Sequence, residues 1–216
     1  MHSTLFQSMA QSILDGEEEQ AKALAQQALD AGIDPLEAIN QGFVVGINQV
    51  GEQFSCGNAF LPELVMAGET MKAALSVLEP EMARRGTQRQ LFGKVVLATI
   101  QGDIHDIGKT LVGTMLSASG FQVYDLGVDV PIAKIVAKTQ EVGADIVGMS
   151  ALLTTTMVNQ RTAIQKLQEA GLRPKVKVMV GGAPVTRSWA AEIGADGYSE
   201  DAIGAVALAK QLLGAK

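Results

Sequence analysis

The first 85 residues share one pattern, in which apolar side chains recur every three or four positions. The clearest run comprises Ala21, Leu24, Ala25, Ala28 and Leu29, followed by Leu36, Ile39, Phe43, Val44, Ile47 and Val50. This spacing is typical of helices with one buried face, and it predicts no strand in this part of the chain. Breaks at Asp15-Gly16, at Ala31-Gly32, over 55–58 and at Pro62 divide the segment into four helices.

The pattern ends at 84–90, a polar stretch without an apolar residue. We expect a linker there, with a domain boundary near residue 88 that separates a domain of residues 1–88 from one of residues 89–216.

Beyond the linker, short β-branched runs alternate with amphipathic helices. The expected strands are Lys94–Ile100, Phe121–Leu126, Asp145–Met149, Lys175–Val180 and Gly197–Tyr198. Continuous apolar strands joined by helices predict a parallel sheet covered on both faces. The fold class is therefore α/β: a four-helix bundle followed by a Rossmann-like, flavodoxin-like domain with a five-stranded parallel sheet. Ligands of such sheets bind in the loops at the carboxyl ends of the strands.

Composition and charge narrow the class of protein. The net charge of −6 has the wrong sign for a protein that binds nucleic acid through its phosphates. No apolar run has the length of a membrane span, and the first twenty residues lack the blocks of a signal peptide, so we expect a cytoplasmic protein. The single cysteine, Cys56, cannot form an intramolecular disulfide, and we expect it to be a partly buried thiol.

The loop after the first expected strand, 101–109, carries the most distinctive chemistry. It reads QGDIHDIGK and contains one of the two histidines of the chain, His105. Gly102 and Gly108 enclose five residues where a P-loop needs four, and the enclosed aspartates would repel a phosphate. Nucleotide binding is therefore disfavoured.

His105 lies two residues after Asp103, a spacing that suits a metal ligand whose second ring nitrogen is held by a carboxylate. One histidine cannot hold a bare metal ion, and the sequence offers no second histidine motif or thiolate cluster. The metal should arrive already chelated by a macrocycle, which points to haem or a corrinoid. A loop histidine satisfied by neighbouring carboxylates, with no ligand, remains the alternative.

Three motifs resemble the cobalamin-binding signature of corrinoid proteins. They are Asp103-x-His105-x-x-Gly108, Ser150-x-Leu152 and Gly181-Gly182, each at the end of an expected strand. The segment 54–64 also resembles the helical cap of cobalamin-dependent methionine synthase and of small corrinoid methyl-carrier proteins. The resemblance covers nearly the whole chain, and it implies cobalamin (methylcobalamin or a related corrinoid) as the cofactor, with its cobalt.

The resemblance implies roles by position. His105 is the cobalt ligand, Asp103 accepts a hydrogen bond from it, and Thr156 is the third member of this relay, where methionine synthase more often has serine. Gly102, Ile104, Asp106 and Gly108 belong to the same cofactor-binding loop.

The nucleotide tail of the cofactor needs a slot between sheet and helix. Residues expected to line the slot or bond to the tail are Ser150, Leu152, Thr154, Gly181, Gly182, Tyr198 and Ala202. In the helical domain, Phe54 and Leu61 match the residues that cover the methyl group, with packing inside the bundle as the alternative.

Nothing in the sequence resembles a second catalytic centre, so the resemblance implies a carrier that is not catalytic alone. Its expected partners are a substrate:corrinoid methyltransferase, a corrinoid:acceptor methyltransferase with an acceptor such as tetrahydrofolate or a thiol, and a reductive activating protein. Three alternatives stay open: a cobalamin-dependent sensor or regulator, a small subunit of an adenosylcobalamin mutase, and a corrinoid-free binding module.

Overall fold

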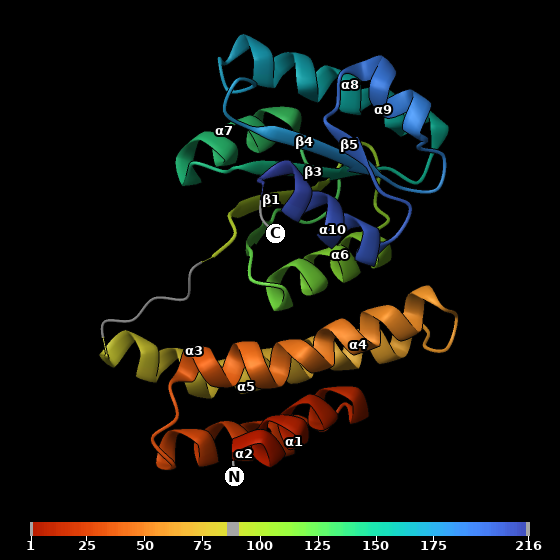
Figure 1. Ribbon diagram of the computed structural model, residues 1–216. Helices are drawn as coiled ribbons and strands as arrows, with labels where there is room; N and C mark the ends of the chain where they lie inside the picture. The colour runs from red at the N-terminus through yellow and green to blue at the C-terminus, as the bar shows by residue number, and fades with distance from the viewer. Residues whose placement is uncertain (1, 86–90, 215–216) are drawn as a thin grey trace. The chain divides into compact units, whose positions relative to one another are not determined.

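The computed structural model describes residues 2–85 and 91–214, and the chain divides into two compact units, Met1–Gln90 and Leu91–Lys216. The first unit is helical and the second contains a sheet (Figure 1). Residues 86–90, where the sequence predicts the linker and the boundary near residue 88, lie outside the described residues.

The helical unit consists of four rods. Its elements are α1 (His2–Asp15), α2 (Glu18–Asp30), the continuous run of α3 (Pro35–Glu37), η1 (Ala38–Phe43) and α4 (Val44–Ser55), and α5 (Leu61–Arg84). The third rod starts where expected, because the Asp34 side chain accepts hydrogen bonds from the amides of Leu36 (2.9 Å) and Glu37 (3.3 Å). Pro35 fits the first turn, where no amide donor is needed.

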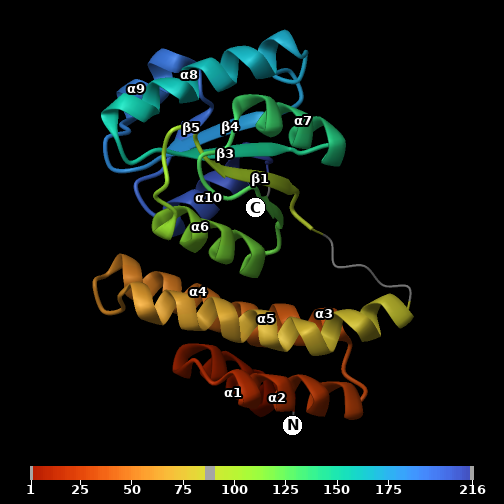
Figure 2. The ribbon, with the colours of Figure 1, turned by 180° about the vertical axis from the view of Figure 1, so that it is seen from behind.

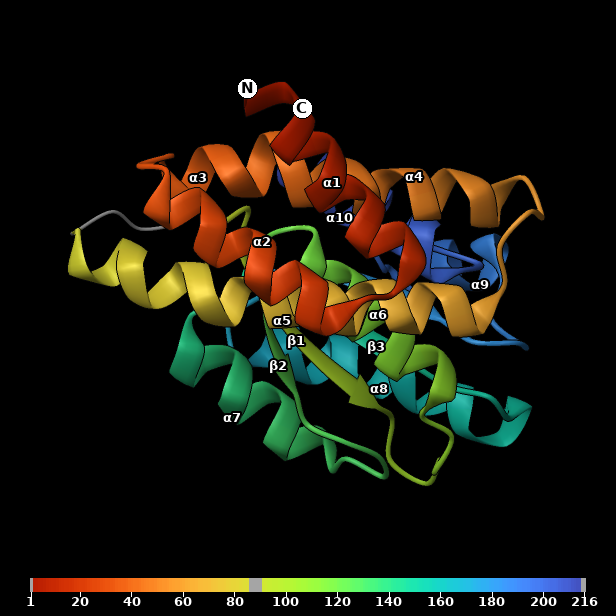
Figure 3. The same ribbon diagram turned by 90° about the horizontal axis from the view of Figure 1, so that it is seen from below.

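Figure 3 shows α1 crossing the third rod and α2 crossing α5. The third rod contains one π-helical segment, η1, which apolar periodicity does not reveal. Two glycines let α1 approach closely: a Cβ on Gly42 would lie 2.6 Å from the Met9 sulfur, and one on Gly46 would lie 2.5 Å from the Ala10 carbonyl oxygen. Aliphatic side chains and Phe43 fill the core between the rods.

The second unit contains a five-stranded parallel sheet, as predicted, and the strand order is β2-β1-β3-β4-β5. The strands are β1 (Lys94–Thr99), β2 (Gln122–Asp125), β3 (Ile146–Ser150), β4 (Lys177–Gly181) and β5 (Gly197–Tyr198). Their bounds differ from the expected ranges by at most two residues at either end.

Helices cover both faces of this sheet, as Figures 1 and 2 show. Helices α6 (Ile107–Ala118) and α10 (Ala202–Leu212) pack together on one face, and α7 (Ile132–Val142), α8 (Thr154–Glu169) and α9 (Arg187–Ile193) pack on the other. The inner strands β1, β3 and β4 are buried between these layers, and their apolar runs therefore show no alternation. The loops after β1, β3 and β4 meet at one edge of the sheet, where the three sequence motifs lie.

Candidate functional site

Asp103 lies in the loop between β1 and α6, and its carboxylate is the centre of the site. The residue is 1% exposed. Oδ1 accepts hydrogen bonds from Nδ1 of His105 (2.7 Å) and from the His105 amide (3.1 Å). Oδ2 accepts from Oγ1 of Thr156 (2.6 Å) and from the Leu152 amide (2.8 Å). Hydrogen bonds thus join Asp103, His105 and Thr156, the three residues of the expected relay, and they connect the loop after β1 to the start of α8.

These hydrogen bonds favour the charged carboxylate. Burial alone would raise the pKa of Asp103, but the donors from Thr156, His105 and Leu152 more than offset it and hold the pKa well below its ordinary range. Asp103 is therefore a fixed negative charge at neutral pH, and it orients the imidazole ring.

The His105 side chain is 46% exposed although Asp103 is buried. Because Nδ1 is bonded to the carboxylate, Nε2 is the nitrogen available to a metal. Among the described residues no three His, Cys, Asp or Glu side chains gather in a group that could hold a metal ion. A metal bound by His105 would need its other ligands from a chelating group.

The surface beside His105 suits a flat apolar ring. Ile104 and Ile107 are 73% and 72% exposed, and Leu152 is also exposed, an unusual use of large apolar side chains. At Gly108 a Cβ would have no neighbour within 4 Å, and Asp106 is exposed just before α6. The residues present therefore fit a corrinoid that approaches from this side.

Two hydroxyl groups connect β3 to the loop of His105. Thr99 donates a hydrogen bond to the His105 carbonyl oxygen (2.8 Å), which leaves the Ser150 hydroxyl to donate to Thr99 Oγ1 (3.0 Å). The Ser150 hydroxyl, expected to bond to the nucleotide tail, thus lies against Thr99 on β1, which in turn binds the loop of His105.

Gly181-Gly182 brings the loop after β4 against the loop after β3. Gly182 has φ +119°, and a Cβ there would lie 1.8 Å from the Ala151 carbonyl oxygen, so only glycine fits. A Cβ on Gly181 would lie 3.2 Å from the Ser199 carbonyl oxygen.

The remaining residues expected along the slot are more dispersed. Thr154 is exposed at the start of α8. Tyr198 is half-buried on β5 and packs against the core, and Ala202 is buried at the start of α10. Their roles as walls of the slot stay predictions.

In the helical unit, Phe54 is half-buried near the end of α4, and Leu61 is exposed at the start of α5. Phe60, beside it, is 65% exposed, and its amide donates to the Glu63 carboxylate (3.0 Å), which closes the first turn of α5. The prediction for Cys56 was wrong: the thiol is exposed, because it lies in the turn that follows α4.

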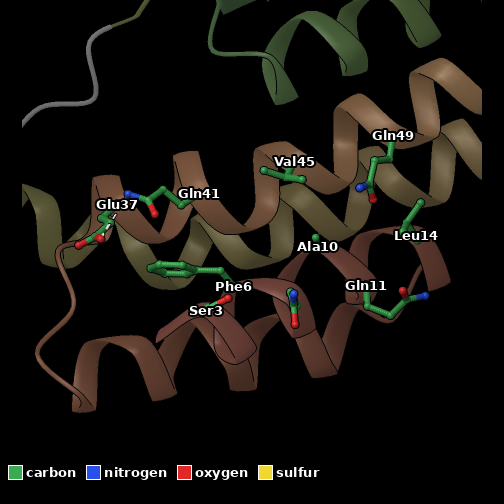
Figure 4. A pocket seen from close by; sticks show the side chains of 10 residues that line it. Ser3, Phe6, Ala10, Gln11, Leu14, Glu37, Gln41, Val45 and Gln49 are labelled. Atoms are coloured by element: carbon green, nitrogen blue, oxygen red, sulfur yellow. Dashed lines mark hydrogen bonds between the residues drawn. The ribbon is translucent and has the colours of Figure 1, made fainter. Parts of the chain in front are cut away.

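A groove of about 580 Å³ lies in the helical unit between α1 and the third rod, and Figure 4 shows the side chains that line it. Its lining is mainly amide and apolar, and the Glu37 carboxylate accepts a hydrogen bond from Gln41 (3.3 Å). None of the residues that the sequence singled out lines this groove.

Three residues that the sequence did not single out bind the backbone of the loop that carries His105: Thr99, Asp129 and Asn159. Asp129 could have been found, because it follows β2 and therefore lies at the same edge of the sheet as the motifs. Asn159 carries no such signal, because helix periodicity does not distinguish an amide that bonds to a loop from an ordinary surface residue. No helix within 2–85 or 91–214 is long and apolar enough to cross a membrane.

Comparisons with known proteins agree with this geometry. Two family models, each described as a B12 binding domain, match residues 93–207 and 5–79. A corrinoid protein of Desulfitobacterium hafniense (strain Y51) is 47% identical over 215 residues, which cover 99% of this chain and 100% of that protein. Trimethylamine corrinoid protein 2 of Methanosarcina mazei is 51% identical over 202 residues, 94% of this chain and 93% of that protein.

Solved structures give the same result. The methanol:cobalamin methyltransferase complex MtaBC of Methanosarcina barkeri contains a chain that aligns with a TM-score of 0.87 and 30% identity, covering 99% of this chain and 81% of that one. A cobalamin-binding protein of Desulfitobacterium hafniense DCB-2 aligns with a TM-score of 0.78 and 37% identity over 94% of this chain and 96% of that one. With both units matched and the histidine relay in place, the chain belongs to the family of B12-binding corrinoid proteins.

Proposed function

We propose that this chain carries a methyl group on a bound corrinoid, receiving it from one methyltransferase and delivering it to another. The observation that carries the proposal is the hydrogen-bonded series Thr156–Asp103–His105, which ends in a half-exposed imidazole with Nε2 available. When bound, the corrinoid supplies a cobalt centre that accepts and releases a methyl group. The chain itself supplies a ligand and shielding.

His105 is the residue we assign to the cobalt, through Nε2. Asp103 keeps the ring in the tautomer that has its proton on Nδ1, because the carboxylate needs a donor there. The hydrogen bond at Nδ1 does not involve Nε2, so the relay can hold the ring in the same orientation whether or not Nε2 is coordinated.

Phe54 and Leu61 of the helical unit are proposed to shield the methyl group. Support comes from the resemblance to the helical cap and from the exposed apolar side chains that surround Leu61, namely Phe60, Val65 and Met66. Such a cluster is costly in water unless it is covered for part of the working cycle.

The proposed partners are methyltransferases specific for the donor and for the acceptor, with a reductive activating protein as a third. Support for the donor enzyme comes from the relatives named for trimethylamine and dimethylamine and from the methanol:cobalamin methyltransferase complex. Within this chain, the described residues offer no other constellation for the chemistry of a donor or an acceptor, so donor choice is assigned to the partner enzyme.

The test begins with the purified protein, incubated with hydroxocobalamin and freed of unbound corrinoid by gel filtration. The wild type should retain about one corrinoid per chain, with a visible spectrum that changes in His105→Ala. The matched control is His2→Ala, which removes the other imidazole of the chain and should leave the spectrum unchanged. A wild type that retains no corrinoid would contradict the proposal, and an unchanged His105→Ala spectrum would contradict the ligand assignment.

Transfer is tested separately from binding. The protein, loaded with methylcobalamin, is mixed with candidate acceptor methyltransferases and either tetrahydrofolate or a thiol, and demethylation is followed in the visible spectrum. Transfer only in the presence of a partner supports a carrier. Transfer by the chain alone would make it an enzyme in its own right.

A further inference from the structure

The backbone segment that leads to His105 is held from the loop after β2 by a single residue, Asp129. Its Oδ1 accepts a hydrogen bond from the Gly102 amide at 2.7 Å, and its own amide donates to the Asp103 carbonyl oxygen at 2.8 Å. One residue thus binds two successive residues of the loop, the second of which carries the relay carboxylate.

Asp129 holds this position in an unfavourable backbone conformation. Its φ is +47°, and it is the one residue other than glycine with a positive φ in the described part of the chain. Aspartate and asparagine tolerate this region better than most residues, but the conformation still costs energy and persists only where surrounding contacts enforce it. Strained residues of this kind concentrate at functional sites.

The loop around Asp129 is itself firmly anchored. The Gly127 amide donates to Asp125 Oδ1 (2.9 Å), and the other Asp125 oxygen pairs with the buried Lys109 ammonium on α6. The main chain of Thr99 bonds to the loop twice, donating to the Gly127 carbonyl oxygen (3.0 Å) and accepting from the Val130 amide (3.1 Å). Because its own loop is anchored in this way, Asp129 can hold the segment 102–103 in a fixed position.

The opposite side of the segment is bound by α8. Asn159 Nδ2 donates to the Gln101 carbonyl oxygen (2.9 Å) and Thr156 binds the Asp103 side chain. Of these two α8 contacts, the one from Thr156 reaches the Asp103 carboxylate, whereas Asp129 reaches only the backbone. Together with the Asp103 amide, which donates to the Ile100 carbonyl oxygen (3.1 Å), Asp129 fixes the position of the Asp103 main chain independently of the relay.

We propose that Asp129 is a positioning residue for the His105 ligand: by binding the Gly102 amide and the Asp103 carbonyl it holds the loop in the geometry that places the imidazole at the metal. The role rests on the proposed function, because it concerns a ligand to cobalt. It adds a residue of the loop after β2 to a site otherwise made by the loops after β1, β3 and β4.

Three substitutions separate the two properties of Asp129. Asp129→Asn keeps an oxygen acceptor and tolerates a positive φ. Asp129→Gly keeps the backbone conformation and removes the acceptor. Asp129→Ala removes the acceptor and disfavours the conformation. The matched control is Asp145→Ala, because Asp145 makes the same pair of contacts at the other end of the sheet, accepting from the Lys94 amide (2.7 Å) and donating to its carbonyl (2.9 Å).

The first readout is amide hydrogen exchange of Gly102 in the protein without corrinoid. Loss of one hydrogen bond should speed this exchange by about tenfold in Asp129→Gly and Asp129→Ala, with Asp129→Asn close to the wild type. In the control Asp145→Ala, the exchange rate of the Gly102 amide should change no more than the change in global stability requires.

The second readout is electron paramagnetic resonance of the protein labelled with 15N at histidine and loaded with cob(II)alamin, in which coupling to 15N reports an imidazole of the protein bound to cobalt and coupling to 14N reports the benzimidazole of the cofactor. The fraction without 15N coupling should rise in the Gly and Ala variants and should match the wild type in Asp129→Asn and Asp145→Ala. His105→Ala gives the spectrum without histidine coordination. A wild-type level of coordination in Asp129→Ala would overturn the inference and leave the proposed function intact. Absence of bound corrinoid in the wild type would overturn both.

Discussion

Thr156 and Asp103, 53 residues apart in the sequence, are joined by a hydrogen bond of 2.6 Å from the threonine hydroxyl to Oδ2 of the carboxylate. The bond links the first turn of α8 to the loop after β1, and the hydroxyl also lies 3.0 Å from the Leu153 carbonyl oxygen. A threonine and a serine can both make it, which accounts for the use of either residue at this position in the resemblance.

Removal of this hydroxyl should destabilise the sheet-containing unit. Thr156→Val keeps the shape but deprives the buried carboxylate of a donor, and it should lower the free energy of unfolding by about 2 kcal/mol. Thr156→Ser should stay within about 0.5 kcal/mol of the wild type because its hydroxyl can bond to Asp103. Urea unfolding followed by the fluorescence of Trp189, the single tryptophan, reports on this unit. Equal losses in both variants would assign the effect to packing.

The charge of Asp103 should make the stability of the protein without corrinoid depend on pH. A pKa held below its ordinary value means that the folded state favours the carboxylate, so the stabilisation is present above about pH 4 and is lost as the pH falls below it. Asp103→Asn cannot titrate. The wild type should therefore be more stable than this variant at pH 5 and above, and the gap should narrow between pH 4 and 3. Urea unfolding across this range checks it, and a gap that widens on acidification would contradict it.

Gly182 should be intolerant of any side chain. Gly182→Ala places a Cβ 1.8 Å from the Ala151 carbonyl oxygen in a strained conformation, and it should cost about 4 kcal/mol or more. Gly143→Ala is the control, because Gly143 also has a positive φ (+62°) but a Cβ there would meet nothing within 4 Å. That change should cost about 1–2 kcal/mol. Thermal or urea unfolding of the two variants gives the difference, and similar losses would show that the close approach to Ala151 relaxes easily.

The loss of stability should differ according to which partner of the Lys109–Asp125 ion pair is removed. The Lys109 side chain is 4% exposed and the Asp125 side chain 37%. Asp125→Asn leaves a buried ammonium without its counter-charge and should cost about 3 kcal/mol or more. Lys109→Met fills the space with apolar atoms and leaves a carboxylate that water can reach, so it should cost about 1 kcal/mol or less. Urea unfolding of the two single variants compares these losses, and a larger loss of stability in Lys109→Met than in Asp125→Asn would contradict the prediction.

Periodicity was sufficient to predict the two units, the four helical rods and the parallel sheet. Apolar side chains at helical spacing and unbroken β-branched runs are direct consequences of one-sided and two-sided burial, so they are visible in a single sequence. The π-helical segment η1 was not predictable, because the spacing of apolar residues does not distinguish a single π-helical turn from the α-helix on either side of it.

The relay was predictable because Asp103 and His105 are two residues apart and Thr156 matches a position of the family pattern. Asp129 was missed, since its role depends on main-chain contacts to Gly102 and Asp103 that only the folded sheet brings together. Exposure of Cys56 was equally hidden, because composition places cysteines inside and only the local turn places this one outside.

Ile104 and Ile107 flank His105, yet more than two-thirds of each residue is exposed, so neither is needed to build the core. The loop that carries His105 is held instead by the Asp103 carboxylate, the Thr99 hydroxyl and the side chain and amide of Asp129. Substitutions at 104 and 107 should therefore change the surface offered to the proposed corrinoid without loss of the fold. For protein engineering, a library randomised at these two positions is the natural start for adapting the carrier to non-natural metal macrocycles.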